Sequence, residues 1–251
     1  MNVIDTRLPA LLRSGNPLLG LFVGLPSPAL VEMAGHAGFE FVIVDNEHGP
    51  ASIETTEHLL RAARASGIVP VVRTQESDIL RVLDIGASAI QVPQVESAEQ
   101  AARIVAAAKY APIGARGAAF STRAAGYGFF GGAPHVAASN EGTAVIVMAE
   151  SRRALDALDA ILAVPGVDAV FFGPNDLSFS LGHPGEMQHP EVVAAIEFGI
   201  DRALAAKVTP GVLVTSPEQF RRWAARGARY LPMVATGLIG GAMRAAVAAT
   251  R

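Results

Sequence analysis

The sequence of 251 residues predicts an α/β fold, a (β/α)8 TIM barrel that takes up residues 1–251 as a single domain. Two observations predict it. Short apolar runs, typical of strands buried on both faces, alternate with segments that carry the apolar stripe of an amphipathic helix. Eight such strand–helix pairs can be placed from Leu19 onward, as a barrel requires. A doubly wound open sheet is the main alternative, but it would usually need fewer strands for this length.

The eight predicted strands follow in order along the chain. They are Leu19–Val23, Phe41–Val44, Val69–Val72, Ala89–Val92, Ala144–Glu150, Ala169–Phe172, Gly211–Val214 and Arg229–Val234. Gly173-Pro174 ends the sixth of them.

Helices are predicted between these strands from caps and apolar periodicity. Ser27-Pro28 gives an N-cap and a proline at the first helical position, and Ser97 to Gln100 fits a capping box for a helix that runs to Ala108. The other predicted helices cover His58–Ser66, Asp78–Leu83, Ala154–Leu162, Val192–Leu204, a segment capped by Ser216 to Gln219, and Gly240–Ala249. Tyr110–Asn140, rich in glycine, alanine and aromatic residues, is interpreted as a long functional loop.

Composition excludes several classes of protein. The net charge is −3 without a lysine or arginine run, which argues against partners such as nucleic acid or an anionic membrane surface. The absence of cysteine excludes disulfides, thiolate metal sites and a cysteine nucleophile. Met1–Gly20 does not read as a signal peptide, and no apolar stretch approaches the ~18 residues of a membrane span. We therefore expect a cytoplasmic enzyme.

Two carboxylates follow two consecutive predicted strands. Glu150 stands at the end of the fifth strand and Asp176 just past the sixth, and a helix joins the two strands. Because neighbouring strands lie about 5 Å apart, both acids can reach one hard cation. Taken singly, each could be only a helix N-cap. As a matched pair they favour a divalent metal site.

Other polar residues follow the second, third and fourth strands. His48 is either a structural loop histidine or a general base, and its neighbours Asp45 and Glu47 favour the base. Arg73 either pairs with a nearby acid or binds a substrate carboxylate in a bidentate manner. Gln94 stands in the corresponding place after the fourth strand.

Further candidates carry weaker signals. His183 and His189 lie in one loop, but the prolines beside them favour turn and helix-start roles over metal binding. Gly237, Gly240 and Gly241 open the last predicted helix, where either phosphate binding or close packing explains them. The two lysines, Lys109 and Lys207, end helices that lead toward strands and so belong at the bottom of the barrel. A Schiff-base aldolase needs a lysine among the strand ends. Carbanion chemistry here would therefore require a metal.

At these residues the chain resembles the HpcH/HpaI aldolase family, metal-dependent pyruvate aldolases on a barrel of the phosphoenolpyruvate/pyruvate type. The resemblance runs from Gly20 to the C-terminal helix. Its most specific blocks are Val44-Asp45-Asn46-Glu47-His48, Pro70-Val71-Val72-Arg73, Leu83-Asp84-Ile85-Gly86, Glu150-Ser151-Arg152 and Phe172-Gly173-Pro174-Asn175-Asp176.

The resemblance implies roles for these residues. Glu150 and Asp176 would hold Mg²⁺, Mn²⁺ or Co²⁺, which pyruvate would chelate. Arg73 would neutralise the enolate or aldehyde oxygen, and Pro174, Asn175 and Asp176 would contact the substrate, with backbone N–H groups around Asn175-Asp176 on its carboxylate. His48, oriented by Asp45 and by Asp84 at a subunit contact, would move the proton through a water.

The resemblance also implies an assembly and one departure. We expect a homo-oligomer, a homohexamer built as a trimer of dimers, with the C-terminal helix exchanged between subunits. Met148 stands where many members have a glutamine close to bound pyruvate, and a thioether cannot donate a hydrogen bond.

Three functions are weighed. The first is reversible cleavage of a 4-hydroxy-2-oxoacid to pyruvate and a small aldehyde through a metal-stabilised pyruvate enolate. The second keeps the metal but acts on a CoA ester, as citrate and malyl-CoA lyases do, with Arg221, Arg222 and Arg226 as candidates for the CoA phosphates. The third is a barrel that only binds a small acid, or a sugar-phosphate isomerase that uses Gly237–Gly241.

Overall fold

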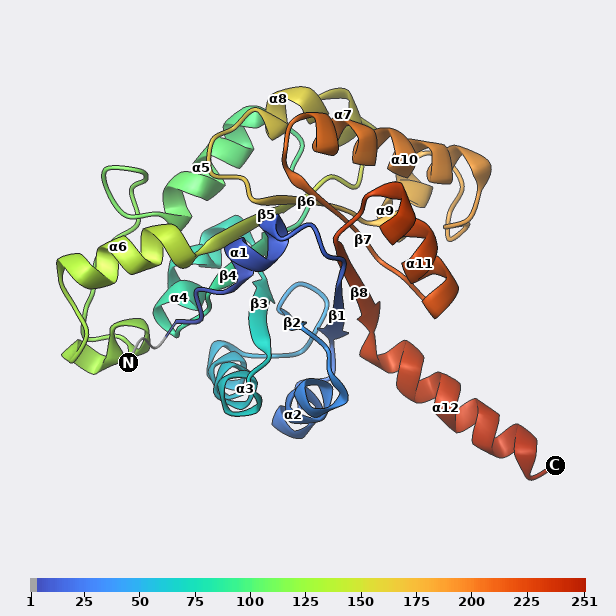
Figure 1. The fold of residues 1–251 in the computed structure, drawn as a ribbon, viewed down its shortest axis with the longest axis horizontal. Coiled ribbons are helices and arrows are strands. Elements are labelled where there is room, and N and C mark those ends of the chain that lie inside the picture. Colours follow the sequence, from blue (N-terminus) through green and yellow to red (C-terminus); the bar gives the residue numbers. More distant parts are fainter. Residues whose placement is uncertain (1–3) are drawn as a thin grey trace.

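A computed structural model describes residues 4–251 as a closed barrel of eight parallel strands (Figure 1). Each strand pairs with its neighbours in sequence, and the last strand returns to the first. The strands are β1 (Leu18–Val23), β2 (Phe41–Asp45), β3 (Val69–Arg73), β4 (Ala89–Val92), β5 (Ala144–Met148), β6 (Ala169–Phe172), β7 (Thr209–Val212) and β8 (Tyr230–Val234). The predicted (β/α)8 barrel is confirmed, and each predicted strand is found within two residues at either end.

Helices surround the strands as an outer layer (Figure 1). They are α1 (Leu8–Arg13), α2 (Pro28–Ala37), α3 (Ile53–Ser66), α4 (Ile79–Asp84), α5 (Ala98–Ala108), α6 (Ala133–Gly142), α7 (Arg152–Asp156), α8 (Leu158–Leu162), α9 (Pro174–Ser180), α10 (Pro190–Ala205), α11 (Pro217–Arg226) and α12 (Ala235–Ala249), with 3-10 turns η1 (Glu76–Asp78) and η2 (Arg123–Gly128). Two of the three predicted caps form through the side chain: the hydroxyl groups of Ser97 and Ser216 accept the N–H groups of Gln100 and Gln219. Ser27 stands at the N-cap position of α2, but its side chain makes no capping hydrogen bond.

The strands divide the buried side chains into two cores. Along β2, Phe41 and Ile43 belong to the inner core, whereas Val42 and Val44 pack toward the helices. Phe41 stacks on Tyr230 with 4.2 Å between ring centroids. The unpredicted helix α1 adds Leu8 and Leu12 to the inner core. It therefore closes the N-terminal end of the barrel, and the other end carries the strand C-termini.

Several predicted segments differ from the structure. Tyr110–Asn140 is not one loop, because it contains η2 and most of α6. The sequence of α6 carries no amphipathic stripe, since the residues that it buries are His135, Ser139 and Gly142. The predicted helix Ala154–Leu162 is two short helices, α7 and α8, with a break at Ala157.

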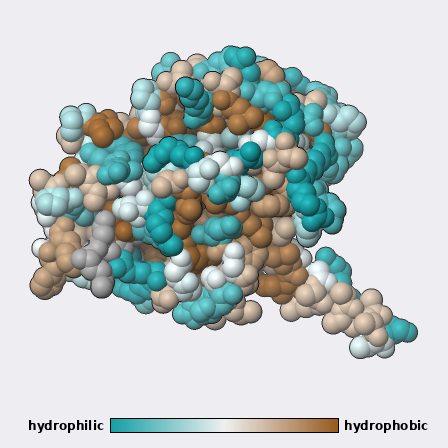
Figure 2. All heavy atoms as spheres, viewed as in Figure 1, coloured by the Kyte–Doolittle hydropathy of each residue, from teal (hydrophilic) through white to brown (hydrophobic). Residues whose placement is uncertain are grey.

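The last helix begins five residues earlier than predicted, at Ala235 rather than Gly240. Gly240 and Gly241 are therefore interior to α12 and cannot offer free N–H groups to a phosphate. The helix extends away from the barrel (Figure 1), and only Ala235 is buried in it. Leu238, Met243 and Val247 are exposed, and the projecting arm carries much apolar surface (Figure 2). No described helix is long and apolar enough to cross a membrane.

Candidate active site at the carboxyl ends of the strands

A cavity of about 370 Å³ opens at the carboxyl ends of the strands. The residues that line it come from most of the strand ends. They are Phe22, Gly24, Asp45, His48, Arg73, Met148, Phe171, Gly173, Pro174, Asn175, Asp176, Leu213, Val234 and Thr236. Six residues predicted for the site, Asp45, His48, Arg73, Pro174, Asn175 and Asp176, therefore share one cavity.

Glu150 and Asp176 face the same space across Gly173. A β-carbon at Gly173 would lie 2.7 Å from Glu150 Oε2 and 3.6 Å from Asp176 Oδ2, so a side chain here would force the Glu150 carboxylate to shift. Neither acid is a helix N-cap: Ser151 caps α7, and Gly173 precedes α9. The alternative reading of the two acids as simple caps is thus excluded by the geometry.

The Glu150 carboxylate lacks a partner on one side. Its Oε1 accepts the Gln94 N–H at 2.8 Å, whereas Oε2 is buried with no hydrogen-bond partner in the described chain. Burial raises the pKa of Glu150 to about 7, and the charges of Asp176 and Glu47 raise it further against the opposing Gln94 N–H. A buried carboxylate and a more exposed one that repel each other across a shared space fit a divalent cation. Gln94 serves through its backbone, at φ 54°, and not through its side chain.

Arg73 lies in a second corner and is already paired within the chain. It donates two hydrogen bonds to Asp45, Nε to Oδ1 at 2.8 Å and Nη2 to Oδ2 at 2.6 Å. Its Nη1 is 3.0 Å from Glu47 Oε2, and the Phe22 ring lies 4.9 Å from its central carbon. Burial alone would lower the pKa of Arg73, but Asp45 and Glu47 outweigh it and raise that pKa. The bidentate geometry that we expected for a substrate carboxylate is therefore taken by Asp45.

His48 lies at the rim of the cavity with 69% of its side chain exposed. Its backbone N–H donates to Asp45 Oδ1 at 3.2 Å, as does that of Glu47 at 3.1 Å. The imidazole Nε2 instead faces Glu47 Oε2 at 3.7 Å. Asp45 thus fixes the backbone of the loop, and Glu47 is the acid beside the imidazole.

Asp84 lies apart from the cavity. It is the last residue of α4, and its carboxylate forms an ion pair with Arg116 at 2.9 Å. The Arg116 side chain is buried. Within the described chain no hydrogen bond or ion pair joins Asp84 to His48, and its role at a subunit contact stays a prediction.

The apolar half of the cavity was not predicted. Phe22, Leu213 and Val234 come from β1 and from the ends of β7 and β8, where no charged residue marked a site in the sequence. Met148 also lines the cavity, and its Sδ accepts a hydrogen bond from Gln91 Nε2 at 3.3 Å. Their place at or next to the carboxyl end of a strand was the only feature of the sequence that could have predicted these residues as cavity-lining.

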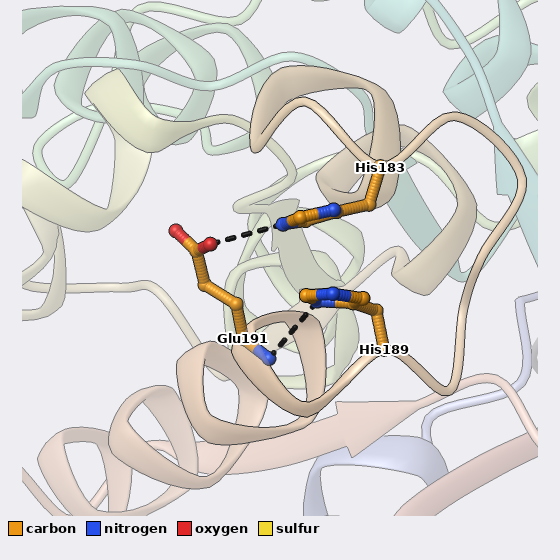
Figure 3. A group of neighbouring side chains, drawn as sticks. All are labelled: His183, His189 and Glu191. Carbon is orange, nitrogen blue, oxygen red and sulfur yellow. Dashed lines mark hydrogen bonds and ion pairs between the residues drawn. The ribbon is translucent and has the colours of Figure 1, made fainter.

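His183 and His189 stack on each other, with 3.4 Å between ring centroids and 18° between planes (Figure 3). His183 Nε2 is 3.0 Å from Glu191 Oε2, while His189 Nδ1 accepts the Glu191 N–H at the start of α10. These three residues are close enough to be considered as metal ligands. Nearly parallel rings, however, cannot both direct their in-plane lone pairs at one ion. Their arrangement fits the predicted turn and helix-start roles.

The lysines lie away from the cavity. Lys109 is buried, and its Nζ donates to the carbonyl groups of Asn140 and Thr143 at the amino end of β5. Lys207 is exposed in the turn before β7. No lysine is among the residues that line the described cavity, so Schiff-base chemistry has no amine there.

A closed (β/α)8 barrel with these acidic, basic and imidazole groups at its strand ends defines an enzyme, and its site suits a small acidic substrate. The sequence profile of the family described as HpcH/HpaI aldolase/citrate lyase matches residues 18–240. The 2-keto-3-deoxy-L-rhamnonate aldolase of Salmonella paratyphi B is 39% identical over 224 residues, which cover 88% of this chain and 83% of that protein.

Solved structures agree. An HpcH/HpaI aldolase/citrate lyase family protein from Burkholderia cenocepacia superposes with a TM-score of 0.93 and 32% identity, over 98% of this chain and all of that one. A Mycobacterium tuberculosis protein in complex with magnesium and pyruvate shares the fold at 19% identity, with a TM-score of 0.59 over 89% and 87% of the two chains. The chain belongs to the HpcH/HpaI aldolase/citrate lyase family. It is a carbon–carbon lyase of the class II pyruvate aldolase type.

Proposed function

We propose that Glu150 and Asp176 hold a divalent ion, Mg²⁺, Mn²⁺ or Co²⁺, beside which a 4-hydroxy-2-oxoacid is cleaved to pyruvate and an aldehyde. The observation that carries this proposal is the buried Glu150 Oε2, which has no partner in the described chain and shares the space over Gly173 with Asp176. When bound, the ion supplies a Lewis acid for the 2-keto group.

The residues of this chain have separate tasks in the reaction. His48 takes the proton of the 4-hydroxyl group, directly or through a water, as the C3–C4 bond breaks and the aldehyde forms. The electron pair of that bond stays on the three-carbon acid, and His48 returns the proton, directly or through a water, to C3 to give pyruvate. Arg73, held by Asp45, stabilises the oxygen on which negative charge develops. Pro174 and Asn175 line the wall that receives the acid.

The aldehyde is proposed to be small and uncharged. The side of the cavity formed by Phe22, Leu213 and Val234 is apolar, and Thr236 adds a hydroxyl group there. Among the cavity-lining residues, the one arginine, Arg73, is held by Asp45 and Glu47. An aldehyde with a terminal carboxylate would therefore bury its charge without a partner from this chain.

Metal removal and aldehyde screening test the proposal. EDTA should abolish cleavage and Mn²⁺ or Co²⁺ should restore it, whereas borohydride with pyruvate should leave the enzyme active. A borohydride-trapped adduct would refute the metal-dependent route. A screen of short aliphatic aldehydes against carboxylated ones should favour the uncharged set.

The CoA-ester alternative has less support. Arg221, Arg222 and Arg226 on α11 are each paired with an acid, Glu218, Glu197 and Asp201 respectively. They form a solvated, charge-balanced helix face rather than a basic groove. Turnover of CoA esters would reverse this preference.

The proposed assembly is a homo-oligomer, a homohexamer made as a trimer of dimers. The support is α12, whose apolar residues Leu238, Met243 and Val247 lie exposed on a helix that leaves the barrel. We propose that this helix is exchanged between subunits. Light scattering on the full chain and on a variant shortened at residue 234 tests it, and a monomeric full chain would refute it.

A further inference from the structure

A second cavity, of about 330 Å³, lies at the end of the barrel opposite the strand-end cavity. Its described lining includes Pro70, near the start of β3, and Gly86, just before β4. Residues at the amino ends of parallel strands lie on the face away from the carboxyl ends. The two cavities share no described lining residue, so the second one is a separate space.

The described wall of this second cavity is rich in arginine. Arg7, Arg64 and Arg123 line it, and Asp5 is the one acid among its described lining residues. Both Asp5 oxygens are taken by Arg7, whose Nε donates to them at 2.9 and 3.1 Å. The wall therefore carries an excess of positive charge that Asp5 does not balance.

Arg123 is the most enclosed of these cations, with 9% of its side chain exposed. Its Nη1 donates to the Ile85 carbonyl at 2.8 Å, whereas its Nη2 has no hydrogen-bond partner within the described chain. Its ion-pair partner, Glu57, is 4.0 Å from Nε and also pairs with Arg61. Burial lowers the pKa of Arg123, and the charges of Arg61 and Arg64 lower it further against the opposing Glu57. A buried cation with so little compensation is costly unless an anion pairs with it.

We propose that this second cavity binds a small oxyanion with two negative charges, such as a phosphate group or a dicarboxylate. The planar fork of a guanidinium group matches the paired oxygens of either anion. Arg123 supplies its Nη2 hydrogens, and Arg64 on α3 adds a second positive charge. The volume lies in the range of ligand pockets, about 300–1,000 Å³, and leaves room for an organic group attached to the anion. The site is independent of the reaction proposed at the strand ends.

Calorimetric titration of the full-length protein tests this site, with inorganic phosphate, glycerol 3-phosphate and malonate as separate probes at constant ionic strength. At least one of them should bind, and the strongest binder tells whether a free phosphate, a phosphate monoester or a dicarboxylate is preferred. Arg64→Gln should lower the affinity about tenfold, because a charge-assisted contact is lost. Arg64 is exposed on α3, so the fold should be retained. Arg222→Gln, which removes an exposed pair with Glu197, is the matched control and should change the affinity less than about twofold.

Arg123→Lys provides a second test that does not depend on the first variant. Lysine keeps the charge but loses the planar fork, so the affinity should again fall about tenfold. Thermal unfolding gives an independent readout, because a bound anion raises the Tm of the parent protein and this rise should shrink in both variants.

Failure of all three anions to bind would overturn the proposal, and so would parental affinity in both Arg64→Gln and Arg123→Lys. An equal loss of affinity in Arg222→Gln would overturn it as well, since the attraction would then be general rather than local. If Arg123→Lys does not fold, Arg64→Gln decides alone.

Discussion

Two corners of the cavity each contain a pair of acids, and they differ in what balances the negative charge. In the corner between β2 and β3, Asp45 and Glu47 surround Arg73, so the charges are balanced within the chain. In the corner between β5 and β6, Glu150 and Asp176 form no ion pair with another described residue, and Glu150 Oε2 has no hydrogen-bond partner in the described chain. In the first corner the negative charges are paired with Arg73, and the ion pairs hold these side chains in place. In the second corner the negative charges lack such a pair, and a bound cation would supply it.

The largest effect should come from unbalancing the first corner. Arg73→Ala leaves Asp45 and Glu47 buried without their cation, and the free energy of unfolding should fall by about 3–5 kcal/mol. Urea denaturation measures it. The matched control is Arg222→Ala, which removes an exposed pair with Glu197 and should have far less effect. Equal losses of unfolding free energy in the two variants would show that the buried ion pairs of Arg73 stabilise the fold no more than a solvent-exposed pair does.

Emptying the second corner should affect activity rather than stability. Glu150→Ala removes a proposed ligand, so Mn²⁺ affinity and cleavage should each fall about 100-fold or more. Calorimetric titration and turnover assays measure the two quantities. His183→Ala, which disrupts the other acid–histidine group, should leave both unchanged. Retention of Mn²⁺ binding by Glu150→Ala would place the ion elsewhere.

The unbalanced corner should also give the metal-free protein an inverted pH dependence. The folded pKa of Glu150, about 7, lies above its unfolded value of about 4.5, so folding favours the protonated form. Stability from this group is present below about pH 4.5 and is lost as the pH rises through 7, by about 3 kcal/mol. Thermal unfolding in EDTA checks it, and Glu150→Gln should flatten the profile. A flat profile in the parent protein would contradict the raised pKa.

At the first corner the sign of the pH effect is opposite. Burial raises the pKa of Asp45, but the pairing with Arg73 outweighs it, and the net pKa lies below the ordinary value of 3.8. The pair therefore stabilises the fold above that value, and this stabilisation is lost as the pH falls further. In acid-unfolding experiments Asp45→Asn should have a lower free energy of unfolding at neutral pH than the parent protein. It should also lack the part of the acid-induced loss that comes from protonation of Asp45.

The smallest change tests the shape of the second corner alone. Gly173→Ala adds a methyl group 2.7 Å from Glu150 Oε2 without altering any charge. Mn²⁺ affinity should fall about tenfold because the carboxylate must move. Gly237→Ala in α12, where a β-carbon meets nothing within 4 Å, is the control. Unchanged affinity in Gly173→Ala would show that the space over Gly173 is not the binding site.

The strands were predictable because each is a short apolar run buried on both faces, and the polar residue that follows marks its carboxyl end. Their position at the strand ends was therefore enough to predict that Asp45, Arg73 and Asp176 lie in one cavity. Chain length and local sequence pattern do not show which side chains form ion pairs. The ion pairs of Arg73 with Asp45 and Glu47 could therefore be found only from the structure. The same holds for α6, whose buried face consists of polar and small residues.

Apolar cavity residues such as Phe22 and Leu213 escaped prediction for a different reason. In the sequence they are indistinguishable from core residues, because the cavity wall continues the inner core upward. Helix α1 was also missed, since six residues with a proline near their start give too short a periodicity to detect.

The closure of the barrel has a consequence for its synthesis. β1 pairs with β8, and the Thr209 hydroxyl donates to the Leu12 carbonyl across 197 positions of sequence. One edge of β1 pairs with β2 soon after synthesis, whereas its other edge must wait for β8, near the end of the chain. Such long-range contacts make folding slow, and until β8 arrives the first strand presents an open edge to other chains. Chaperone dependence should accordingly last until β8 has left the ribosome.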